Sequence, residues 1–155
     1  MGNKELKLEI TFLSDWAILT GKSSGGMDNR LLRDERGFPY IPGKTIKGVL
    51  RESAEEIAAI LNDDKILKLF GKKKERETDN QNKEDGILVF SDALLDSDLR
   101  NEIIALNDND RVFVLEEASF SSPRIEIDPK TNMTKDRALA FIELGRKGLS
   151  FEGSI

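Results

Sequence analysis

Apolar and polar residues alternate over residues 6–13, and the alternation places Leu6, Leu8, Ile10 and Phe12 on one face. A period of two residues is that of a β-strand with one face against a core. We therefore predict a half-buried strand over Leu6–Leu13.

The pattern changes to a helical period after residue 42. Pro42 and Gly43 interrupt the chain, and Thr45 is a residue type that caps helices with its hydroxyl. Apolar residues then recur at helical spacing, at Ile46, Val49, Leu50, Ile57, Ile60 and Leu61. This spacing predicts an amphipathic helix from near Thr45 to near Asn62, with a buried stripe.

Shorter apolar runs predict the remaining strands. They are Ile87–Phe90, Arg111–Leu115, Arg124–Ile127 and Leu139–Leu144. Residues 96–106 predict one or two helical turns, capped by Asp96 or Ser97. The last two strands are joined by the polar sequence DPKTNMTKDRA, which is long enough to project from the body as an extended β-hairpin.

The predicted order is strand, helix, strand, short helix and then mostly strands. Because strands and helices do not alternate regularly, we expect an α+β fold, and a ferredoxin-like or RRM-like half fits it best. Residues 15–42 are predicted to be mostly loop, with a short hairpin around Leu31–Tyr40. The length of 155 residues predicts a single domain over residues 1–155. Residues 71–86 carry no apolar side chain between two flanking glycines, so we expect a mobile, polar insertion there.

Composition limits the chemistry that the chain can perform. Neither cysteine nor histidine is present, which excludes disulfides, thiolate metal sites, a cysteine nucleophile and a histidine general base. Any reaction must use carboxylates, Lys, Arg, Ser, Tyr or a bound metal ion. With 34% charged residues and no long apolar run, the chain is expected to be soluble. The start, MGNKELKLEI, lacks the apolar core of a signal peptide, so we expect a cytoplasmic protein that binds no membrane.

Positive charge gathers in one segment of an acidic chain. Residues 21–51 hold seven basic side chains and three acidic ones, a net charge of about +4, whereas the whole chain carries −5. The basic residues are Lys22, Arg30, Arg33, Arg36, Lys44, Lys47 and Arg51. Such a separation of charge indicates a surface that binds a polyanion.

The sequence Gly43-Lys44-Thr45 before a helix is similar to the end of a nucleotide-binding P-loop. That motif needs a glycine five residues earlier, where this chain has Phe38, so the spacing argues against nucleotide hydrolysis. The helix start still offers free amides to an anion, and Lys44, Lys47 and Arg51 share one helix face. From spacing alone, a phosphate-binding face and an ordinary solvated face are equally good interpretations. Gly48, inside the helix, fits either close approach by a ligand or tight packing.

The acidic and aromatic residues of this region are ambiguous on their own. Asp28 follows a glycine-rich loop and has two interpretations, a ligand for a divalent ion or an ion-pair partner of Arg30 or Arg33. The residues alone favour the ion pair. Trp16 and Tyr40 have the same ambiguity, since each suits both base stacking and the edge of a core.

The run from Ser14 to Ala58, SDWAILTGKSSGGMDNRLLRDERGFPYIPGKTIKGVLRESAEEIA, resembles the RAMP superfamily of CRISPR-associated proteins. The family pattern is a glycine-rich loop, an Asp shortly after it, and then Arg33-Asp34, Gly37 and the stretch Pro39–Arg51. GILVFSDALL at residues 86–95, the segment 122–144 and GLSFEG near the end agree with it. Ala17 stands where many relatives carry a histidine.

The resemblance implies a guide-RNA-binding subunit of a type III CRISPR effector complex. It implies a ferredoxin-like core whose segment 124–144 is an extended hairpin that wedges into the guide–target duplex. The chain ends where relatives continue with a second helix and strand, so we expect a domain that is incomplete at its C-terminus or completed by a partner. The implied partners are CRISPR guide RNA, target RNA and other effector subunits.

The resemblance also implies roles for individual residues. Asp28 would cleave paired target RNA with a divalent metal ion, Mg or Mn, since no histidine is present to move the proton. The expected RNA-binding residues are Lys22, Ser23, Ser24, Arg30, Arg33, Lys44, Thr45, Lys47, Arg51 and Arg124. Two alternatives stay open: a non-catalytic structural subunit of the same complex, and a stand-alone ribonuclease.

Overall fold

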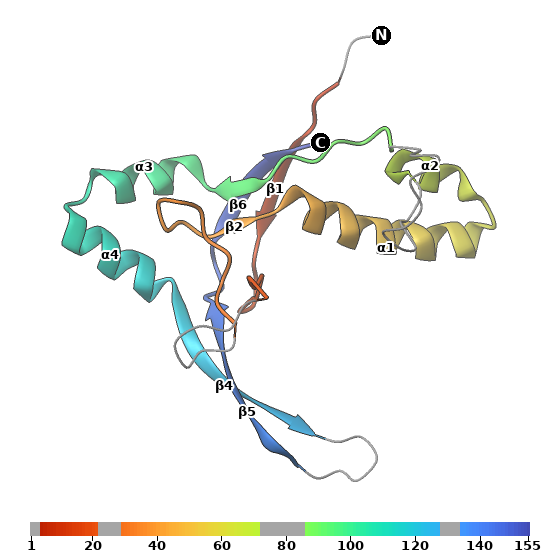
Figure 1. The fold of residues 1–155 in the computed structure, drawn as a ribbon. Helices are drawn as coiled ribbons and strands as arrows, with labels where there is room; N and C mark the ends of the chain where they lie inside the picture. Colours follow the sequence, from red (N-terminus) through yellow and green to blue (C-terminus); the bar gives the residue numbers. More distant parts are fainter. Residues whose placement is uncertain (1–3, 22–28, 72–85, 128–133) are drawn as a thin grey trace. The chain divides into compact units, whose positions relative to one another are not determined.

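The structure, a computed structural model, describes residues 4–21, 29–71, 86–127 and 134–155, without the side chains of residues 125–140 (Figure 1). The chain forms two compact units, and each is described by itself. The first unit comprises Met1–Leu8, Ile41–Ala93 and Gly153–Ile155, and the second comprises Glu9–Tyr40 and Leu94–Glu152. The single domain over residues 1–155 stays a prediction. No helix in the described ranges has the length and apolar character needed to cross a bilayer.

Four short strands form the main sheet. They are β1 (Lys7–Thr11), β2 (Tyr40–Ile41), β3 (Ala93–Leu95) and β6 (Ser150–Ser154), in the order β1-β6-β3-β2. β3 and β6 are antiparallel, with Leu95 opposite Phe151. The predicted first strand is confirmed, because Leu8 and Ile10 of β1 are half-buried while the alternating residues Lys7, Glu9 and Thr11 are exposed.

The order of elements confirms the predicted α+β, ferredoxin-like fold. β1, α1 (Gly43–Leu61), β3 and β6 follow the strand–helix–strand–strand order that opens a ferredoxin-like domain, and β6 lies between β1 and β3 as the third strand of that fold does. Among the described residues, the second helix and fourth strand of such a domain have no counterpart.

In the first unit, α1 begins at Gly43, two residues before the predicted cap. Pro42 occupies the cap position, and no side chain of the cap residue bonds to the helix. Thr45 is inside the first turn, so its predicted capping role is wrong. The predicted end is confirmed, because Asn62 takes a left-handed conformation with φ of 50° directly after Leu61. The short helices η1 (Asp64–Ile66) and α2 (Leu67–Phe70) follow.

The predicted buried strand over Ile87–Phe90 is wrong. Ile87 and Val89 are exposed, and the segment forms no strand in the structure. Instead, the Leu88 amide bonds to the Leu69 carbonyl, and Phe90 stacks on Phe70. The strand of this region is β3, three residues later.

An aromatic cluster forms part of the core of the second unit. Trp16 is buried and stacks on Phe12, with 4.7 Å between ring centroids, and meets Phe151 edge-on. Its indole N–H donates to the Arg146 carbonyl. The backbones of Trp16 and Gly145 exchange two hydrogen bonds. A Cβ on Gly145 would lie 2.2 Å from the indole ring, so this approach requires glycine.

Two helices follow β3 in the second unit. α3 (Ser97–Ala105) confirms the predicted helix, and the Asp96 carboxylate caps it by accepting from the Leu99 amide. The predicted strand over Arg111–Leu115 is wrong, because these residues lie in α4 (Asp108–Glu117). The Asn107 side chain caps α4 by accepting from the Asp110 amide. The four apolar residues 112–115 are too short a run to show a period, and the Asn107 cap stabilises a helix there.

The extended hairpin is formed by β4 (Ser119–Ile127) and β5 (Thr134–Gly145), the long antiparallel pair in Figure 1. Both strands are longer than predicted. Their pairing runs from Ser119 opposite Gly145 to Ile127 opposite Thr134, with an irregularity after Ile125. The connecting residues 128–133 lie outside the described part of the chain.

A half-buried ion pair stabilises the base of this hairpin. The Arg33 guanidinium lies 2.7 Å from the Glu143 carboxylate, and it also donates to the Ser119 hydroxyl and to the carbonyls of Gly37 and Leu115. The other Glu143 oxygen accepts from the Leu31 amide at 2.9 Å. Burial raises the pKa of Glu143, but the hydrogen bonds from Ser119, Arg33 and Leu31 outweigh it and lower that pKa below 4.5.

We expect Glu143→Gln to reduce the free energy of unfolding by about 2 kcal/mol at pH 7, the usual scale for hydrogen bonds to a charged group. Since the folded-state pKa is lowered, this contribution is complete above the unfolded-state value and is lost as the pH falls through the folded-state pKa. Denaturant unfolding from pH 7 to pH 3 should therefore show the gap between wild type and variant closing below pH 4.5. The control is Glu117→Gln, at an exposed carboxylate 3.9 Å from Arg146. A gap of constant size over this range would contradict the charged network.

We expect Gly145→Ala to destabilise the protein by about 1–3 kcal/mol, because the added methyl group overlaps the Trp16 ring. The matched control is Gly48→Ala in α1, where nothing lies within 4 Å of the added Cβ. There, alanine should raise stability by up to about 1 kcal/mol through helix propensity. Thermal unfolding of both variants measures the difference, and equal midpoints would refute the close approach of Gly145 and Trp16.

Candidate nucleic-acid interface

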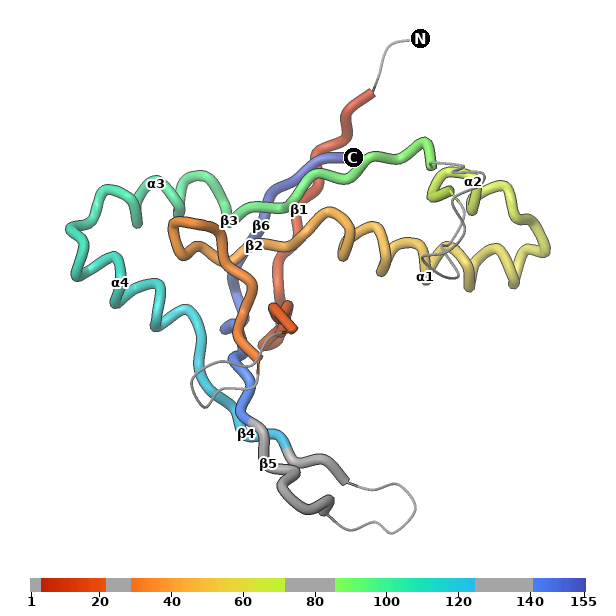
Figure 2. The backbone as a smooth tube through the Cα atoms, viewed as in Figure 1, coloured from red at the N-terminus to blue at the C-terminus, as the bar shows by residue number. Residues whose placement is uncertain are grey.

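The segment from Asn29 to Tyr40 turns back on itself in the second unit (Figure 2). Arg33 and Pro39 form an antiparallel bridge, as the predicted short hairpin requires. Leu31 and Phe38 are buried. These two side chains fix the segment to the core of the unit. The side chains of Arg30 and Arg36 are exposed.

Asp34 holds the turn of this segment. One carboxylate oxygen accepts from the amides of Arg36 and Phe38, and the other accepts from Arg100 of α3 at 2.7 Å. The Arg100 guanidinium also lies over the Phe38 ring, 4.4 Å from its centroid. Burial raises the pKa of Asp34, but the Arg100 and backbone hydrogen bonds outweigh it and lower that pKa. Asp34 is thus a charged structural residue.

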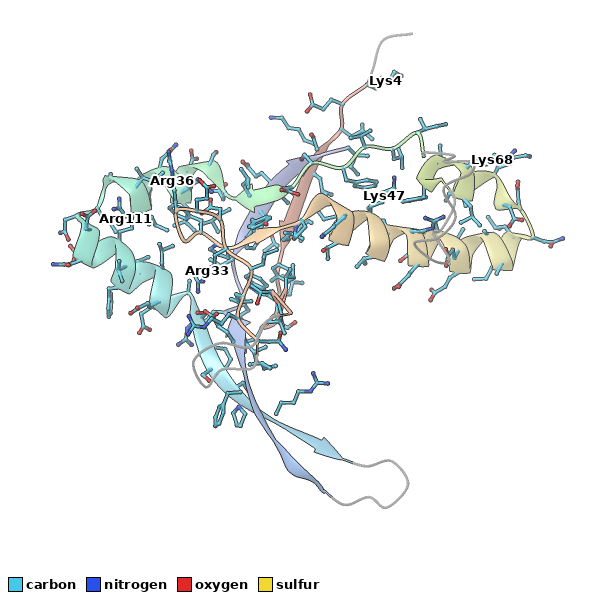
Figure 3. The ribbon with its side chains drawn as sticks, viewed as in Figure 1. Lys4, Arg33, Arg36, Lys47, Lys68 and Arg111 are labelled. Carbon is cyan, nitrogen blue, oxygen red and sulfur yellow. The ribbon has the colours of Figure 1, made fainter. Side chains whose placement is uncertain are left out.

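An open cavity of about 560 Å³ lies between this segment, α4 and the hairpin base. Its lining includes Arg30, Arg33, Arg36, Ser119, Phe120 and Ser121. We call this site the arginine cavity. Figure 3 labels two of these lining residues, Arg33 and Arg36. It brings two of the predicted RNA-binding residues, Arg30 and Arg33, into one site.

The arginines of the arginine cavity have different tasks. Arg33 is neutralised by Glu143, and it also donates hydrogen bonds to Ser119 and two carbonyls. Arg30 and Arg36 are exposed and form no ion pair with any described residue. These two guanidinium groups are therefore the ones available to an external anion.

The predicted basic face of α1 lies in the first unit and is largely engaged by the protein itself. Lys47 donates to the Leu88 carbonyl at 3.2 Å. Arg51 donates to the Gly71 carbonyl and pairs with Glu55 at 3.2 Å. Lys44 is exposed, whereas Thr45 is half-buried. Lys47 and Arg51 of α1 thus bond to described residues on either side of residues 72–85, Leu88 and Gly71.

A carboxylate meets the start of α1. The Gly43 amide donates to Asp92 at 2.8 Å, so the first amide of the predicted anion site already has an internal acceptor. A Cβ on Gly43 would lie 2.3 Å from the Phe90 carbonyl oxygen, which shows how closely the two segments approach. Asp92 was not predicted as part of a site, and its only signal is that Asp is a favoured acceptor at helix starts.

The remaining predicted residues are not brought into either group. Arg124 is exposed on β4. Lys22, Ser23, Ser24 and Asp28 lie outside the described residues. Within the described ranges, no group of three or more acidic side chains is arranged to hold a metal ion. The described residues therefore supply no site that fits a divalent ion, and the catalytic role of Asp28 stays a prediction.

Residues of the arginine cavity that lie far away in the sequence were not predicted. Ser119, Phe120 and Ser121 stand at the start of β4, more than 80 residues after Arg36. Their only sequence signal is their position beside the predicted hairpin. Arg36 belonged to the basic segment but had no assigned role.

Comparisons with known proteins point to one family. The family model of the RAMP superfamily matches residues 9–154. No match is found among curated proteins.

Two solved structures share the fold. A chain of the cryo-EM structure of the Type III-B Cmr-beta bound to cognate target RNA is 14% identical, with a TM-score of 0.70 over 98% of this chain and 83% of that chain. A chain of the Type III-B Cmr-beta cryo-EM structure in the apo state is also 14% identical, with a TM-score of 0.64 over 97% and 82% of the two chains. At this identity the likeness concerns the fold, while the family match covers nearly the whole sequence. This chain therefore belongs to the RAMP superfamily.

Proposed function

We propose that this protein is a guide-RNA-binding subunit of a type III CRISPR effector complex. Membership of the RAMP superfamily and the shared fold with chains of the Type III-B Cmr-beta support this proposal. One of those structures is bound to cognate target RNA. The observation that carries the proposal is the pair of exposed guanidinium groups, Arg30 and Arg36, at the arginine cavity.

The arginine cavity has the chemistry that an RNA backbone needs. Guanidinium groups bind phosphate oxygens through paired N–H donors. The Ser121 hydroxyl lines the same cavity and can bond to ribose or phosphate oxygens, whereas the Ser119 hydroxyl is already bonded to Arg33 and Glu143. Phe120 adds an aromatic surface on which a base can stack. A volume of about 560 Å³ lies within the range of ligand sites of nucleotide size.

Because Arg33 pairs with Glu143, the arginine cavity favours a negatively charged ligand. Because Glu143 is neutralised by Arg33, it presents no net negative charge to an approaching phosphate. Glu116 is the remaining carboxylate of the lining, against Arg30 and Arg36. Contacts of this kind read no base edges, so we propose binding that is independent of guide sequence.

We further propose that Asp28 takes part in cleavage of paired target RNA with a divalent metal ion. This proposal is supported by the family pattern and by the place of Asp28 in the sequence, two residues before Arg30. Such an ion would activate water or polarise a phosphoryl oxygen. The alternative is a subunit that binds RNA and holds the complex together without cutting.

The RNA-binding proposal predicts that Arg30→Ala/Arg36→Ala weakens guide-RNA binding for every guide sequence. Each lost phosphate contact on single-stranded RNA should lower the slope of log affinity against log salt by about 0.7, and two contacts by about 1.4. Fluorescence anisotropy with labelled guide RNA at several salt concentrations measures this slope. Lys65→Ala/Lys68→Ala is the control, because it removes the same charge from the first unit. A slope equal to that of the control would refute the arginine cavity as the RNA contact.

The cleavage proposal predicts that Asp28→Ala abolishes metal-dependent cutting of target RNA in the assembled complex while guide-RNA binding persists. Glu35→Ala is the control, since it removes an exposed carboxylate from the same basic segment. Cleavage is followed on labelled target RNA in the presence of Mg²⁺ and of a chelator. Full cleavage by an intact Asp28→Ala complex would contradict the catalytic role and favour a structural subunit that binds RNA without cutting it. Metal-dependent cutting of free RNA by the purified chain would favour the stand-alone ribonuclease instead.

A further inference from the structure

A further cavity lies beside the arginine cavity in the second unit. It has a volume of about 430 Å³ and is lined by Arg36, Phe38, Ile104 and Arg111. The first two belong to the turn of segment 29–40, whereas Ile104 belongs to α3 and Arg111 to α4. We call this site the second cavity. Figure 3 labels two of its lining residues, Arg36 and Arg111. Arg36 also lines the arginine cavity, so the two cavities share this residue.

Asp34 holds the lining of the second cavity in place. One of its carboxylate oxygens accepts from the amides of Arg36 and Phe38, at 2.9 Å and 3.0 Å. The other accepts from Arg100 of α3 at 2.7 Å, and Ile104 follows Arg100 by one helical turn. One carboxylate thus joins the turn to α3, and these two elements supply three of the four lining residues. A site whose parts are already fixed loses less freedom when a ligand binds.

The second cavity has positive charge that a ligand can use. Arg36 is exposed and forms no ion pair with any described residue. Arg111 pairs with Asp108, which precedes it by three residues on the same helix and has a side chain that is 89% exposed. Such a surface pair contributes little to stability, so the Arg111 guanidinium can exchange Asp108 for a phosphate.

A buried donor lies next to the lining. The Arg100 guanidinium packs over the Phe38 ring, 4.4 Å from its centroid. Its Nη2 atom donates to Asp34, whereas its Nη1 atom is buried and has no hydrogen-bond partner in the part of the chain that the structure describes. Buried donors in proteins are nearly always bonded to the chain, to water or to a ligand. The Arg100 Nη1 atom therefore favours a ligand with acceptor oxygens.

The apolar surface of the second cavity is provided by Ile104, which is 37% exposed. Phe38 is fully buried and lies under Arg100, so its ring is not available for stacking. The cavity thus combines two guanidinium groups with one accessible apolar side chain. This combination suits a ligand that has an anionic group and a flat ring, as a nucleotide has.

We propose that the second cavity binds a neighbouring nucleotide of the RNA strand that occupies the arginine cavity, with its phosphate on Arg36 and Arg111 and its base against Ile104. This inference rests on the proposed function, because the ligand is the same RNA. A strand carries one phosphate per nucleotide, so a strand bound at Arg36 can contact both cavities in turn. A volume of about 430 Å³ lies within the range of ligand sites.

The salt dependence of RNA binding tests the phosphate contact. Fluorescence anisotropy with the full chain and a labelled single-stranded RNA measures affinity at several salt concentrations. Arg111→Ala should lower the slope of log affinity against log salt by about 0.7, and Arg111→Lys should restore it because the charge is kept. The control is Lys147→Ala, which removes an exposed positive charge of the same unit from outside both linings. Equal slopes for Arg111→Ala and the control would overturn the proposal.

The base contact is tested separately, because an apolar contact releases no counterions. Ile104→Ala should weaken RNA binding about fourfold, the effect of roughly one buried methylene, without changing the salt slope. RNA molecules with one abasic residue at successive positions locate the base. At one position, the difference between wild type and Ile104→Ala should vanish. A difference that persists at every position would refute the base contact. Where Ile104→Ala lowers the unfolding midpoint, the Arg111 variants keep the test decisive.

Single variants distinguish failure of this inference from failure of the proposed function. Arg30 lines the arginine cavity and not the second cavity. RNA binding that is weakened by Arg30→Ala but not by Arg111→Ala would refute the second cavity and leave the arginine cavity intact. An unchanged slope in both variants would refute the RNA contact at both cavities. A polyglutamate peptide that binds the wild type but not Arg111→Ala, with RNA binding equal in the two, would assign the second cavity to an acidic protein segment instead.

Discussion

The second unit depends on the ion pair between Arg33 and Glu143. Arg33 comes from the basic segment and Glu143 from the hairpin, and they are separated by 110 residues. Around them, Ser119 and the carbonyls of Gly37 and Leu115 accept further hydrogen bonds from Arg33. One half-buried side-chain pair thus connects the turn, the end of α4 and both strands of the hairpin. Of the other arginines of the segment, Arg51 is engaged in the first unit, whereas Arg30 and Arg36 are exposed cations.

Local patterns allowed much of the fold to be predicted. Alternation identified β1, helical spacing and Asn62 located the end of α1, and Asp96 marked the start of α3. The predictions failed where apolar runs were too short to show a period. Arg111–Leu115 is helical because Asn107 caps it, and Ile87–Phe90 is held by two contacts with residues before position 72.

The candidate site was predictable only in part, because charge along the sequence does not reveal which charges are already paired. Seven basic residues mark the segment 21–51, but partners elsewhere in the sequence determine their roles. Arg33 meets Glu143, Arg51 meets Gly71 and Lys47 meets Leu88, and no spacing within the segment indicates these contacts. The acidic cap Asp92 was missed for the same reason, since it lies 49 residues from Gly43. The family resemblance supplied the functional class, while the distribution of free and paired charges came from the three-dimensional contacts.

The contacts of Lys47 and Arg51 have a consequence for the local stability of the first unit. They bind carbonyls at Leu88 and Gly71, and the Leu88 amide also bonds to Leu69, so both ends of the intervening stretch are fastened to one helix and its neighbour. Carbonyls that lie 17 residues apart in the sequence are thus held by side chains of one helix. Because they share these contacts, α1, Gly71 and the segment at Leu88 should open together as one cooperative unit in hydrogen exchange.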